Sequence, residues 1–330
     1  MIRSNDAGIS QRTNLYAERT MLMHAKPVIV LDKFGQMKPL PKNKSTTIRF
    51  RRPKVFTPAT TPLVEGVTPS TTAFQYEDVS TQIRQYGQVV EVTDVIEDTH
   101  EDPVLQDVSV QCGENIGRTL EQISWGVLRA GTSVTYANGA ARNAVNTPIS
   151  LTKLRAVVRY LRAQKAMMIT RMLSGSADVA TRPIEASFIA IAHTDLEADI
   201  RNLAGFTPIA QYGTRQIIHE QELGTVENLR FLLSPDLGAF PDAGGLKGGM
   251  VSTSGTSADV YPIIILGKEA YGVVPLGGRG AVEPTIIPVG QKTKDDPLGQ
   301  RGIVGWKTWH AAVILNQSWM QRLEVAATAL

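Results

Sequence analysis

Residues 103–130, PVLQDVSVQCGENIGRTLEQISWGVLRA, carry an apolar side chain at nearly every fourth position. Because an α-helix turns once in 3.6 residues, this spacing predicts a long helix with the apolar row on one side. Asp102 can cap its first turn, Pro103 suits the first helical position, and Gly131 stands where a left-handed C-terminal cap is expected. The row consists of Val104, Val108, Cys112, Ile116, Leu120, Ile123 and Val127.

The predicted helix is long enough to cross the whole molecule. At 1.5 Å per residue it spans about 40 Å, whereas a compact chain of this length has a radius of gyration of about 20 Å. Gly113 and Gly117 lie inside it, and each costs about 1 kcal/mol relative to alanine. Either another backbone approaches closely at these glycines, or an ordinary core helix tolerates them.

The composition is that of a globular protein. Of the 330 residues, 42% are hydrophobic and 20% are charged, which excludes a disordered chain and allows two subdomains. The net charge of +3 does not by itself indicate nucleic-acid binding. Cys112 is the single cysteine, which excludes an intramolecular disulfide and fits a reducing compartment. We see no signal peptide and no apolar run long enough for a bilayer, so we expect synthesis in a cytoplasm and no membrane partner.

Charge is distributed unevenly along the first third of the chain. Residues 1–60 hold twelve basic and three acidic side chains, a net charge of +9. Residues 61–110 hold one basic and ten acidic side chains, a net charge of −9. The two stretches could pair within one chain, pair between neighbouring copies, or form two solvated surfaces.

The segments before the helix resemble an arm followed by a long hairpin. Residues 1–44 are basic, proline-containing and without a sustained period, apart from a possible short helix over 11–24. Residues 45–53 alternate as a strand, with Ile48 and Phe50 on the face opposite the arginines, and residues 74–95 are again strand-like. An isolated hairpin is marginal in water, so this one needs something outside its own subdomain to lie on.

The rest of the chain predicts a helix followed by an α+β module. Ser150 caps a second helix, whose basic face could meet nucleic acid or simply be solvated. We expect strands over 187–193, 227–234, 261–266 and 285–289, a short helix over 195–203, and a mobile glycine-rich loop over 238–255. The basic face of the second helix consists of Lys153, Arg155, Arg159, Arg162 and Lys165.

Signatures of catalysis are missing from the sequence. The five histidines and one cysteine form no metal-binding pattern, and no Gly-x-Ser-x-Gly motif is present. The glycines of 244–249 lack the order of a phosphate-binding loop. His193 and Asp195 could form an acid–base pair, but a helix cap made by Thr194 or Asp195 is the interpretation we favour. We therefore predict no catalytic, cofactor-binding or metal-binding residues.

The C-terminal segment is the most distinctive part of the sequence. It holds three tryptophans within 14 residues, and such side chains are expected to pack. The segment resembles the C-terminal signature of the N-four-type major capsid proteins of tailed bacteriophages, and upstream pieces resemble that family in order and spacing. The pieces are Leu40–Asn43, Thr47–Arg52, Leu63–Pro69, Gln85–Gly87, Thr93–Asp94, Asp296–Gly302, Val304–Lys307, Ala312–Asn316 and Trp319–Met320.

The resemblance implies the α+β capsid fold named after phage Hong Kong ninety-seven. In that fold an N-terminal arm, an extended E-loop hairpin, a peripheral (P) domain with a spine helix and an axial (A) domain follow one another. The resemblance assigns the arm to 1–44, the E-loop to 45–92, the P-domain to 93–185 and 285–330 with its spine at 103–130, and the A-domain to 186–284. We see no cleavable scaffolding region, so a scaffold, if needed, would be a separate protein.

The function implied by the resemblance is structural. Copies would assemble as pentamers and hexamers into an icosahedral virion shell around double-stranded DNA, which they contact non-specifically, with portal, scaffolding or decoration proteins as further partners. Alternatives are the shell of a cellular encapsulating compartment, which packages a cargo enzyme, and an α+β enzyme. The candidate subunit contacts are Arg49, Arg51, Arg52, Glu65, Gly66, Gly113 and Gly117.

Overall fold

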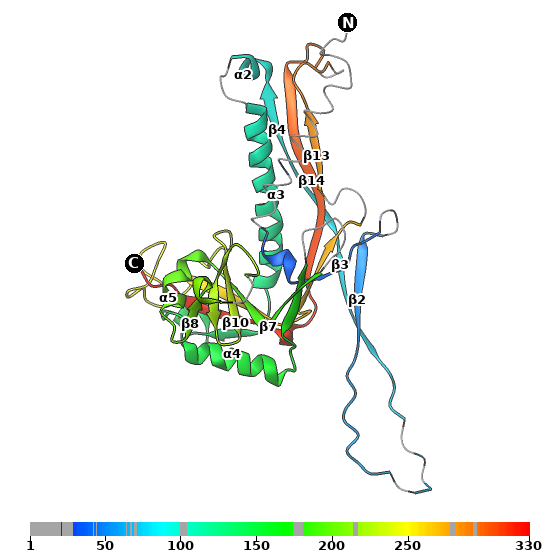
Figure 1. Cartoon of the computed structure of the whole chain (residues 1–330), viewed down its shortest axis with the longest axis vertical. Helices are drawn as coiled ribbons and strands as arrows, with labels where there is room; N and C mark the ends of the chain where they lie inside the picture. Colours follow the sequence, from blue (N-terminus) through cyan, green and yellow to red (C-terminus); the bar gives the residue numbers. More distant parts are fainter. Residues whose placement is uncertain are drawn as a thin grey trace.

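A computed structural model of the chain shows an elongated body from which a long hairpin extends (Figure 1). The body has two parts, an upright part built on one long helix and a rounder part at its foot. The structure describes residues 21, 29–41, 43, 45–63, 65, 66, 68, 71–99, 104–173, 181–213, 217–277, 282–292 and 296–330.

The long helix, α3 (Val104–Arg129), confirms the predicted helix to within a residue at each end. The expected cap at Asp102 and the first position at Pro103 lie outside the described residues. The apolar row is buried at Cys112, Ile116 and Leu120, but Ile123 and Val127 are only half-buried. The buried face instead continues through Glu121, Ser124, Trp125 and Leu128, because two parallel i, i+4 rows, and not one, face the interior.

Gly113 in α3 and Gly131 just after it have steric and not conformational roles. A Cβ at Gly113 would lie 2.2 Å from the Met21 carbonyl oxygen, so the predicted close backbone approach is confirmed there. The predicted left-handed cap at Gly131 is wrong, since its φ is not positive. A Cβ at Gly131 would lie 2.5 Å from Cε of Met320, which explains the glycine by close packing.

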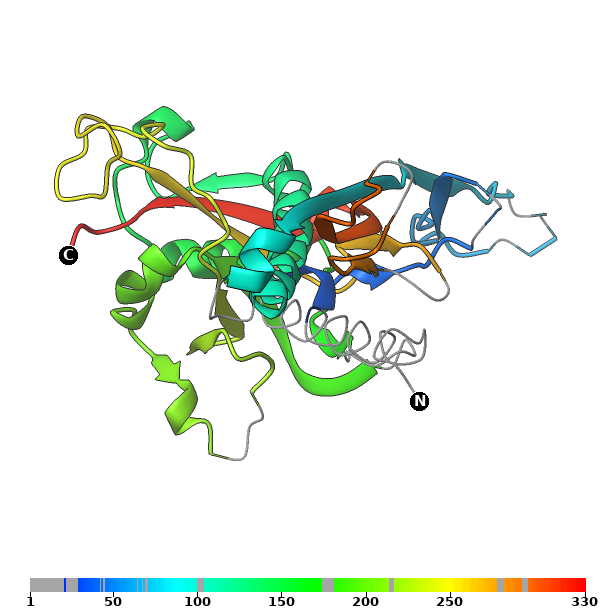
Figure 2. The ribbon, with the colours of Figure 1, turned by 90° about the horizontal axis from the view of Figure 1, so that it is seen from above.

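A five-stranded sheet lies along α3 (Figures 1 and 2). Its longest strand, β14 (Arg301–Ile314), pairs with three others, and β4 runs antiparallel to it over ten residue pairs. Ile116 and Leu120 of α3 pack with Val304 and Trp306 of β14 in one core. The other strands are β1 (Gln36–Met37), β12 (Tyr271–Pro275), β13 (Val282–Ile287) and β4 (Arg84–Thr93), and the short helix α2 (Asp94–Thr99) follows β4.

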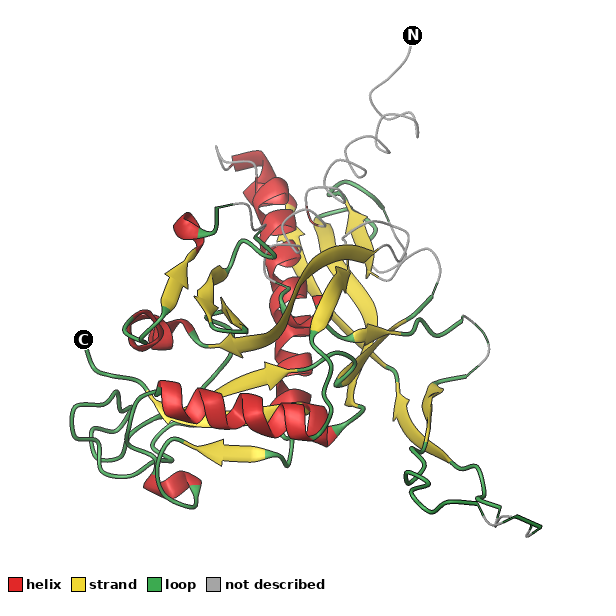
Figure 3. Ribbon diagram, turned by 60° about the horizontal axis from the view of Figure 1, so that its bottom comes forward, coloured by secondary structure: helices red, strands yellow, loops and turns green. Residues whose placement is uncertain are grey.

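The rounder part is an eight-stranded mixed sheet with helices on it (Figure 3). Ser150 caps α4 (Leu151–Ala163) by accepting from the Lys153 N–H at 3.4 Å, as predicted. The apolar face of α4 packs into the core of this sheet. The strands, in spatial order, are β5 (Val134–Tyr136), β15 (Met320–Ala326), β11 (Val260–Leu266), β7 (Thr181–Ala192), β10 (Leu229–Leu233), β9 (Glu222–Val226) and β8 (Phe206–Pro208), with β6 (Ile169–Leu173) paired to β7.

The predicted helix after residue 194 is the 3₁₀ turn η3 (Thr194–Leu196) followed by α5 (Glu197–Arg201). The predicted cap by Thr194 or Asp195 is wrong: the capping side chain is His193, whose Nδ1 accepts from the Asp195 N–H at 3.1 Å and lies 3.2 Å from the Asp195 carboxylate. Asp195 accepts instead from the Tyr261 hydroxyl at 2.7 Å. Three further 3₁₀ turns are η2 (Arg142–Ala144), η4 (Ile209–Gln211) and η5 (Gln317–Trp319).

The glycine-rich loop over 238–255 is held in place by hydrogen bonds. The Asp259 carboxylate accepts from the backbone N–H groups of Asp242 and Thr253. A Cβ at Gly244 would lie 2.3 Å from the Val145 carbonyl oxygen, so this glycine permits close packing of the loop. Packing therefore accounts for this glycine of the 244–249 stretch.

The segment over 29–41 packs into the body, although the sequence assigned it to an arm without a sustained period. Val30 and Leu31 are fully buried, and Phe34 and Leu40 nearly so. The segment forms the 3₁₀ turn η1 (Leu31–Lys33), and β1 then pairs in parallel with β12. Apart from Met21 and this segment, nearly all of the expected arm, including most of the possible helix over 11–24, lies outside the described residues.

Candidate assembly surface at the hairpin

The hairpin is a two-stranded sheet that continues into an irregular loop. Strand β2 (Thr47–Pro53) pairs antiparallel with β3 (Tyr76–Gln82), and no third strand joins them among the described residues. Ile48 and Phe50 are buried at its root, and Arg49 and Arg51, which alternate with them, are exposed, as the alternation predicts. Strand β4 already belongs to the sheet of the body, so the freestanding part ends near Gln82.

The basic and acidic stretches meet across this hairpin. Arg51 donates from Nε and Nη2 to the two carboxylate oxygens of Asp78, at 2.8 and 2.9 Å. Arg52 donates to Oε2 of Glu77 at 2.9 and 2.6 Å. The hydrogen bond from Arg51 lowers the pKa of Asp78 below its usual value. Two of the predicted contact arginines therefore pair within one chain, through the antiparallel register.

The outer part of the hairpin exposes apolar and aromatic side chains. Leu63 is 80% exposed, and Phe56 and Phe74, whose ring centroids are 6.0 Å apart, are each about half exposed. Phe74 also packs edge-on against Tyr76, with centroids 4.7 Å apart. A single chain leaves this cluster in water, whereas a second surface could cover it.

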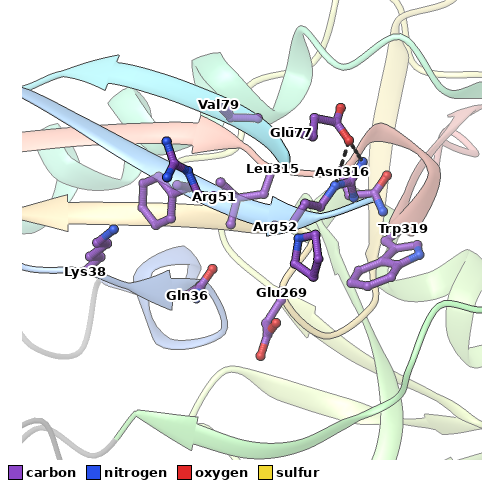
Figure 4. Close-up of a pocket in the computed structure, with 12 residues that line it drawn as sticks. Gln36, Lys38, Arg51, Arg52, Glu77, Val79, Glu269, Leu315, Asn316 and Trp319 are labelled. Carbon is purple, nitrogen blue, oxygen red and sulfur yellow. Dashed lines mark hydrogen bonds and ion pairs between the residues drawn. The ribbon is translucent and has the colours of Figure 1, made fainter. Parts of the chain in front are cut away.

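A groove of about 370 Å³ lies at the root of the hairpin (Figure 4). Arg51, Arg52 and Glu77 from the hairpin line one side, and Leu315, Asn316 and Trp319 from the body line the other. Lys38 also lines the groove and donates to the Arg49 carbonyl oxygen at 2.7 Å. The lining mixes apolar and charged side chains, which suits a protein segment better than a small apolar ligand.

The predicted contact residues fall into two separate places. Arg49, Arg51 and Arg52 lie together on β2, and Glu65 and Gly66 lie in an exposed turn at the outer end, where Gly66 has a φ of +80°. Gly113 and Gly117 are buried in α3, away from that end, and Gly113 contacts the chain's own Met21. Sequence reasoning did not name Phe56 or Phe74, although the prolines and threonines around Phe56 indicate a segment without its own core.

A second, buried site fixes the segment over 29–31 to α3. Glu121 is fully buried, and its Oε2 accepts from the backbone N–H groups of Val30 and Leu31, both at 3.1 Å. Next to it, the Ser124 hydroxyl donates to Asp32 at 2.9 Å and lies 3.0 Å from Nε2 of His310. Burial, and then repulsion from Asp32, raise the pKa of Glu121 to about 8. We call these four side chains the spine cluster.

A buried histidine lies close to the same segment. His219 is 6% exposed, and its Nδ1 accepts from the Gln221 N–H at 3.0 Å. Burial and the nearby charge of Lys33 lower the pKa of His219 to about 4, while a backbone hydrogen bond with Ile29 opposes that shift. The segment over 29–31 therefore contacts two titratable groups whose uncharged forms suit the interior.

Other chemistry is sparse in the part of the chain that the structure describes. There, no group of three or more His, Cys, Asp or Glu side chains is arranged to hold a metal ion. Within the same residues, none of the helices combines the length and the hydropathy that a membrane crossing requires. Burial raises the pKa of the Cys112 thiol, which makes it a packing residue in this environment.

The family model for phage capsid protein matches residues 76–323, which include β3, α3 and the two larger sheets except for β1 and the end of β15. The chain belongs to the phage capsid protein family. This confirms the resemblance drawn from the sequence, and it makes the chain a structural protein of a capsid shell within the virion. A comparison with curated protein sequences finds no match.

Solved phage capsids share the fold of this family member. The capsid of Ralstonia phage GP4 aligns with a TM-score of 0.65 at 13% identity, over 91% of this chain and 89% of that one. The capsid of cyanophage Pam1 aligns with a TM-score of 0.59 at 13% identity, over 93% of both chains. The α+β fold of the Hong Kong ninety-seven type, expected from the sequence, is thereby confirmed.

Proposed function

We propose that this chain is the major subunit of an icosahedral shell around a double-stranded DNA genome, and that its hairpin packs on a neighbouring copy. The observation that carries the proposal is the set of exposed apolar side chains, Phe56, Leu63 and Phe74, in the loop that extends from a two-stranded sheet. Such a hairpin is marginal alone, and covering its apolar side chains would stabilise it. Membership of the capsid family supports assembly into shell oligomers.

The roles of the segments follow the same proposal. Residues 45–92 act as the E-loop, 103–130 as the spine, 93–185 and 285–330 as the P-domain, and 186–284 as the A-domain around the axes of pentamers and hexamers. Residues 1–44 act as the arm, of which 29–41 anchors the arm in the body. Portal, scaffolding and decoration proteins are the further partners that such a shell implies.

The test compares two leucines of equal exposure. Leu63 on the hairpin is 80% exposed and Leu246 in the glycine-rich loop is 78% exposed. We expect Leu63→Ser, and more strongly Phe56→Ser with Phe74→Ser, to lower the yield of shells in electron micrographs and sedimentation. Leu246→Ser should assemble as the unaltered chain does. Normal assembly of the Phe56 and Phe74 double variant would contradict the hairpin contact.

A further inference from the structure

The exposed side of α4 concentrates positive charge, most of which no carboxylate among the described residues pairs with. Arg155, Arg159 and Arg162 recur at i, i+4 and i+7, so they form one stripe along about 10 Å of helix. All three are exposed, and α4 lies on the outside of the rounder part (Figure 3). Arg155 pairs with Glu227 at 2.6 Å, and no described carboxylate lies within ion-pair distance of Arg159 or Arg162.

This arrangement differs from the cross-strand ion pairs of the structure. On the hairpin and on β14, Arg52 faces Glu77 and Lys307 faces Glu283 across the strands. On α4 the arginines are neighbours of one another, and like charges at i, i+3 and i, i+4 destabilise a helix. Its first turn holds no acidic residue, although the positive end of the helix dipole favours one.

The end of α4 gives a second, independent indication. Lys165 has a φ of 57°, in the left-handed region that favours glycine after a helix. Its N–H donates to the Arg162 carbonyl at 2.9 Å, and the Ala166 N–H donates to the Leu161 carbonyl at 2.9 Å. The backbone therefore forms a glycine-type helix end with an exposed lysine at the glycine position. Lys165 is therefore a fourth cation near the three arginines, at a position where the backbone conformation favours glycine.

We propose that this stripe, Arg155, Arg159, Arg162 and Lys165, binds the phosphates of duplex DNA and marks the face of the subunit that meets the packaged genome. The inference rests on the proposed function, and it identifies which surface contacts the nucleic acid. Side chains spaced about 5–6 Å apart along one row can each reach a phosphate of a duplex, whose charges lie every 1.7 Å along its axis. Contacts of this kind read no base edges and suit non-specific binding.

The experiment measures binding of a fluorescent 24-base-pair duplex to the full chain by anisotropy, from 50 to 200 mM salt. Each lost phosphate contact lowers the slope of log K against log salt by about 0.9, so Arg155→Gln, Arg159→Gln and Arg162→Gln together should lower it by about 2.7. The matched control changes three exposed cations elsewhere, Lys54→Gln, Arg84→Gln and Lys292→Gln. An equal loss in the control, or an unaltered slope in the α4 variant, overturns the proposal.

Two further variants separate charge from structure. Replacing the three arginines by lysine keeps the charge and should keep the slope. Lys165→Gly should raise the melting temperature, because glycine suits the left-handed position, and yet weaken duplex binding. A Lys165→Gly chain that is more stable and binds the duplex as before contradicts a role for Lys165.

Assembly provides the remaining outcomes. Shells of the triple arginine variant should form as those of the unaltered chain do, which separates this surface from the hairpin contact. Intact shells should bind added duplex more weakly than free subunits, since the stripe would face inward. If intact shells bind duplex strongly and the triple variant abolishes that binding, the stripe lies on the outside of the shell. If the free chain binds polyglutamate as tightly as duplex DNA, the stripe suits an acidic protein. Either result overturns the proposal.

Discussion

Replacing Glu121 by glutamine should remove a pH dependence of stability that the spine cluster creates. The carboxyl has a pKa of about 8 in the folded chain and an ordinary value of 4.5, so the folded state binds more protons between these values. The contribution of Glu121 to the free energy of unfolding is then fully present below about pH 4.5, decreases as pH rises, and levels off above about pH 8. The facing groups are Asp32, Asp236 and His310, with the Tyr271 hydroxyl, whose pKa burial raises well above 10.

The pH window for the measurement follows from His219. Its pKa of about 4, against an ordinary value of 6.5, makes stability rise with pH between these values and opposes the effect of Glu121 there. Above pH 6.5 the histidine is mostly neutral in both states. Between pH 6.5 and 8 the Glu121 carboxyl alone should remove about 2 kcal/mol, at 1.36 kcal/mol per pH unit.

The assay is urea unfolding of the unassembled subunit at pH 6.5, 7.25 and 8. Glu121→Gln keeps an oxygen that can accept from Val30 and Leu31 but has no charge to desolvate, so its stability should be level across this window. Asp199→Asn is the matched control, because Asp199 is a buried carboxylate that accepts from Thr328 at 2.9 and 2.6 Å. The control should keep the slope of the unaltered chain. A level profile in the unaltered chain, or an equal slope in Glu121→Gln, would refute the reasoning.

Three more outcomes follow from single positions. Between pH 6.5 and 4.5 the opposite effects of His219 and Glu121 should nearly cancel in the unaltered chain, so His219→Gln should make the free energy of unfolding rise by about 2 kcal/mol as pH falls through this range, measured by the same unfolding series. Gly113→Ala should destabilise α3 by about 1–3 kcal/mol, because its Cβ would meet the Met21 carbonyl, whereas Gly126→Ala, with open space around its Cβ, should stabilise it by up to about 1 kcal/mol. Arg52→Glu should weaken the hairpin by up to about 1 kcal/mol, and adding Glu77→Arg should restore it, as read from protease protection of the loop; no restoration would count against the pair.

Local pattern predicted the elements whose partners lie nearby in the sequence. The period of α3, the cap at Ser150 and the alternation around Ile48 and Phe50 depend on a few adjacent residues, and the structure confirms them. The tryptophans pack as expected, with Trp306 4% exposed. The capsid family was found from ordered pieces of sequence and is confirmed by the family model.

Contacts between residues far apart in the chain could not be predicted from the sequence. Glu121 resembles a solvent-facing residue in the sequence, because its partners Val30 and Leu31 lie about 90 residues away. The burial of 29–41 depends on a two-residue parallel pairing with β12 that leaves no periodic signal. The register that joins Arg51 to Asp78 requires knowing where the hairpin turns. The contact residues on the hairpin remain predictions until copies are seen together.

The spine cluster explains why the apolar row on α3 does not run its whole length. The second half of the helix faces a chain segment whose first backbone N–H groups have no strand partner, and an apolar row there would leave them buried and unsatisfied. Glu121 satisfies two of them at the cost of burying a carboxyl, and the raised pKa records that cost. Gly113, two turns earlier on the same face, admits the Met21 backbone. One face of α3 therefore contacts the backbone of the N-terminal segment at two places, and neither place suits a large apolar side chain. The contact with Met21 requires a small residue, and the contact with Val30 and Leu31 requires a hydrogen-bond acceptor.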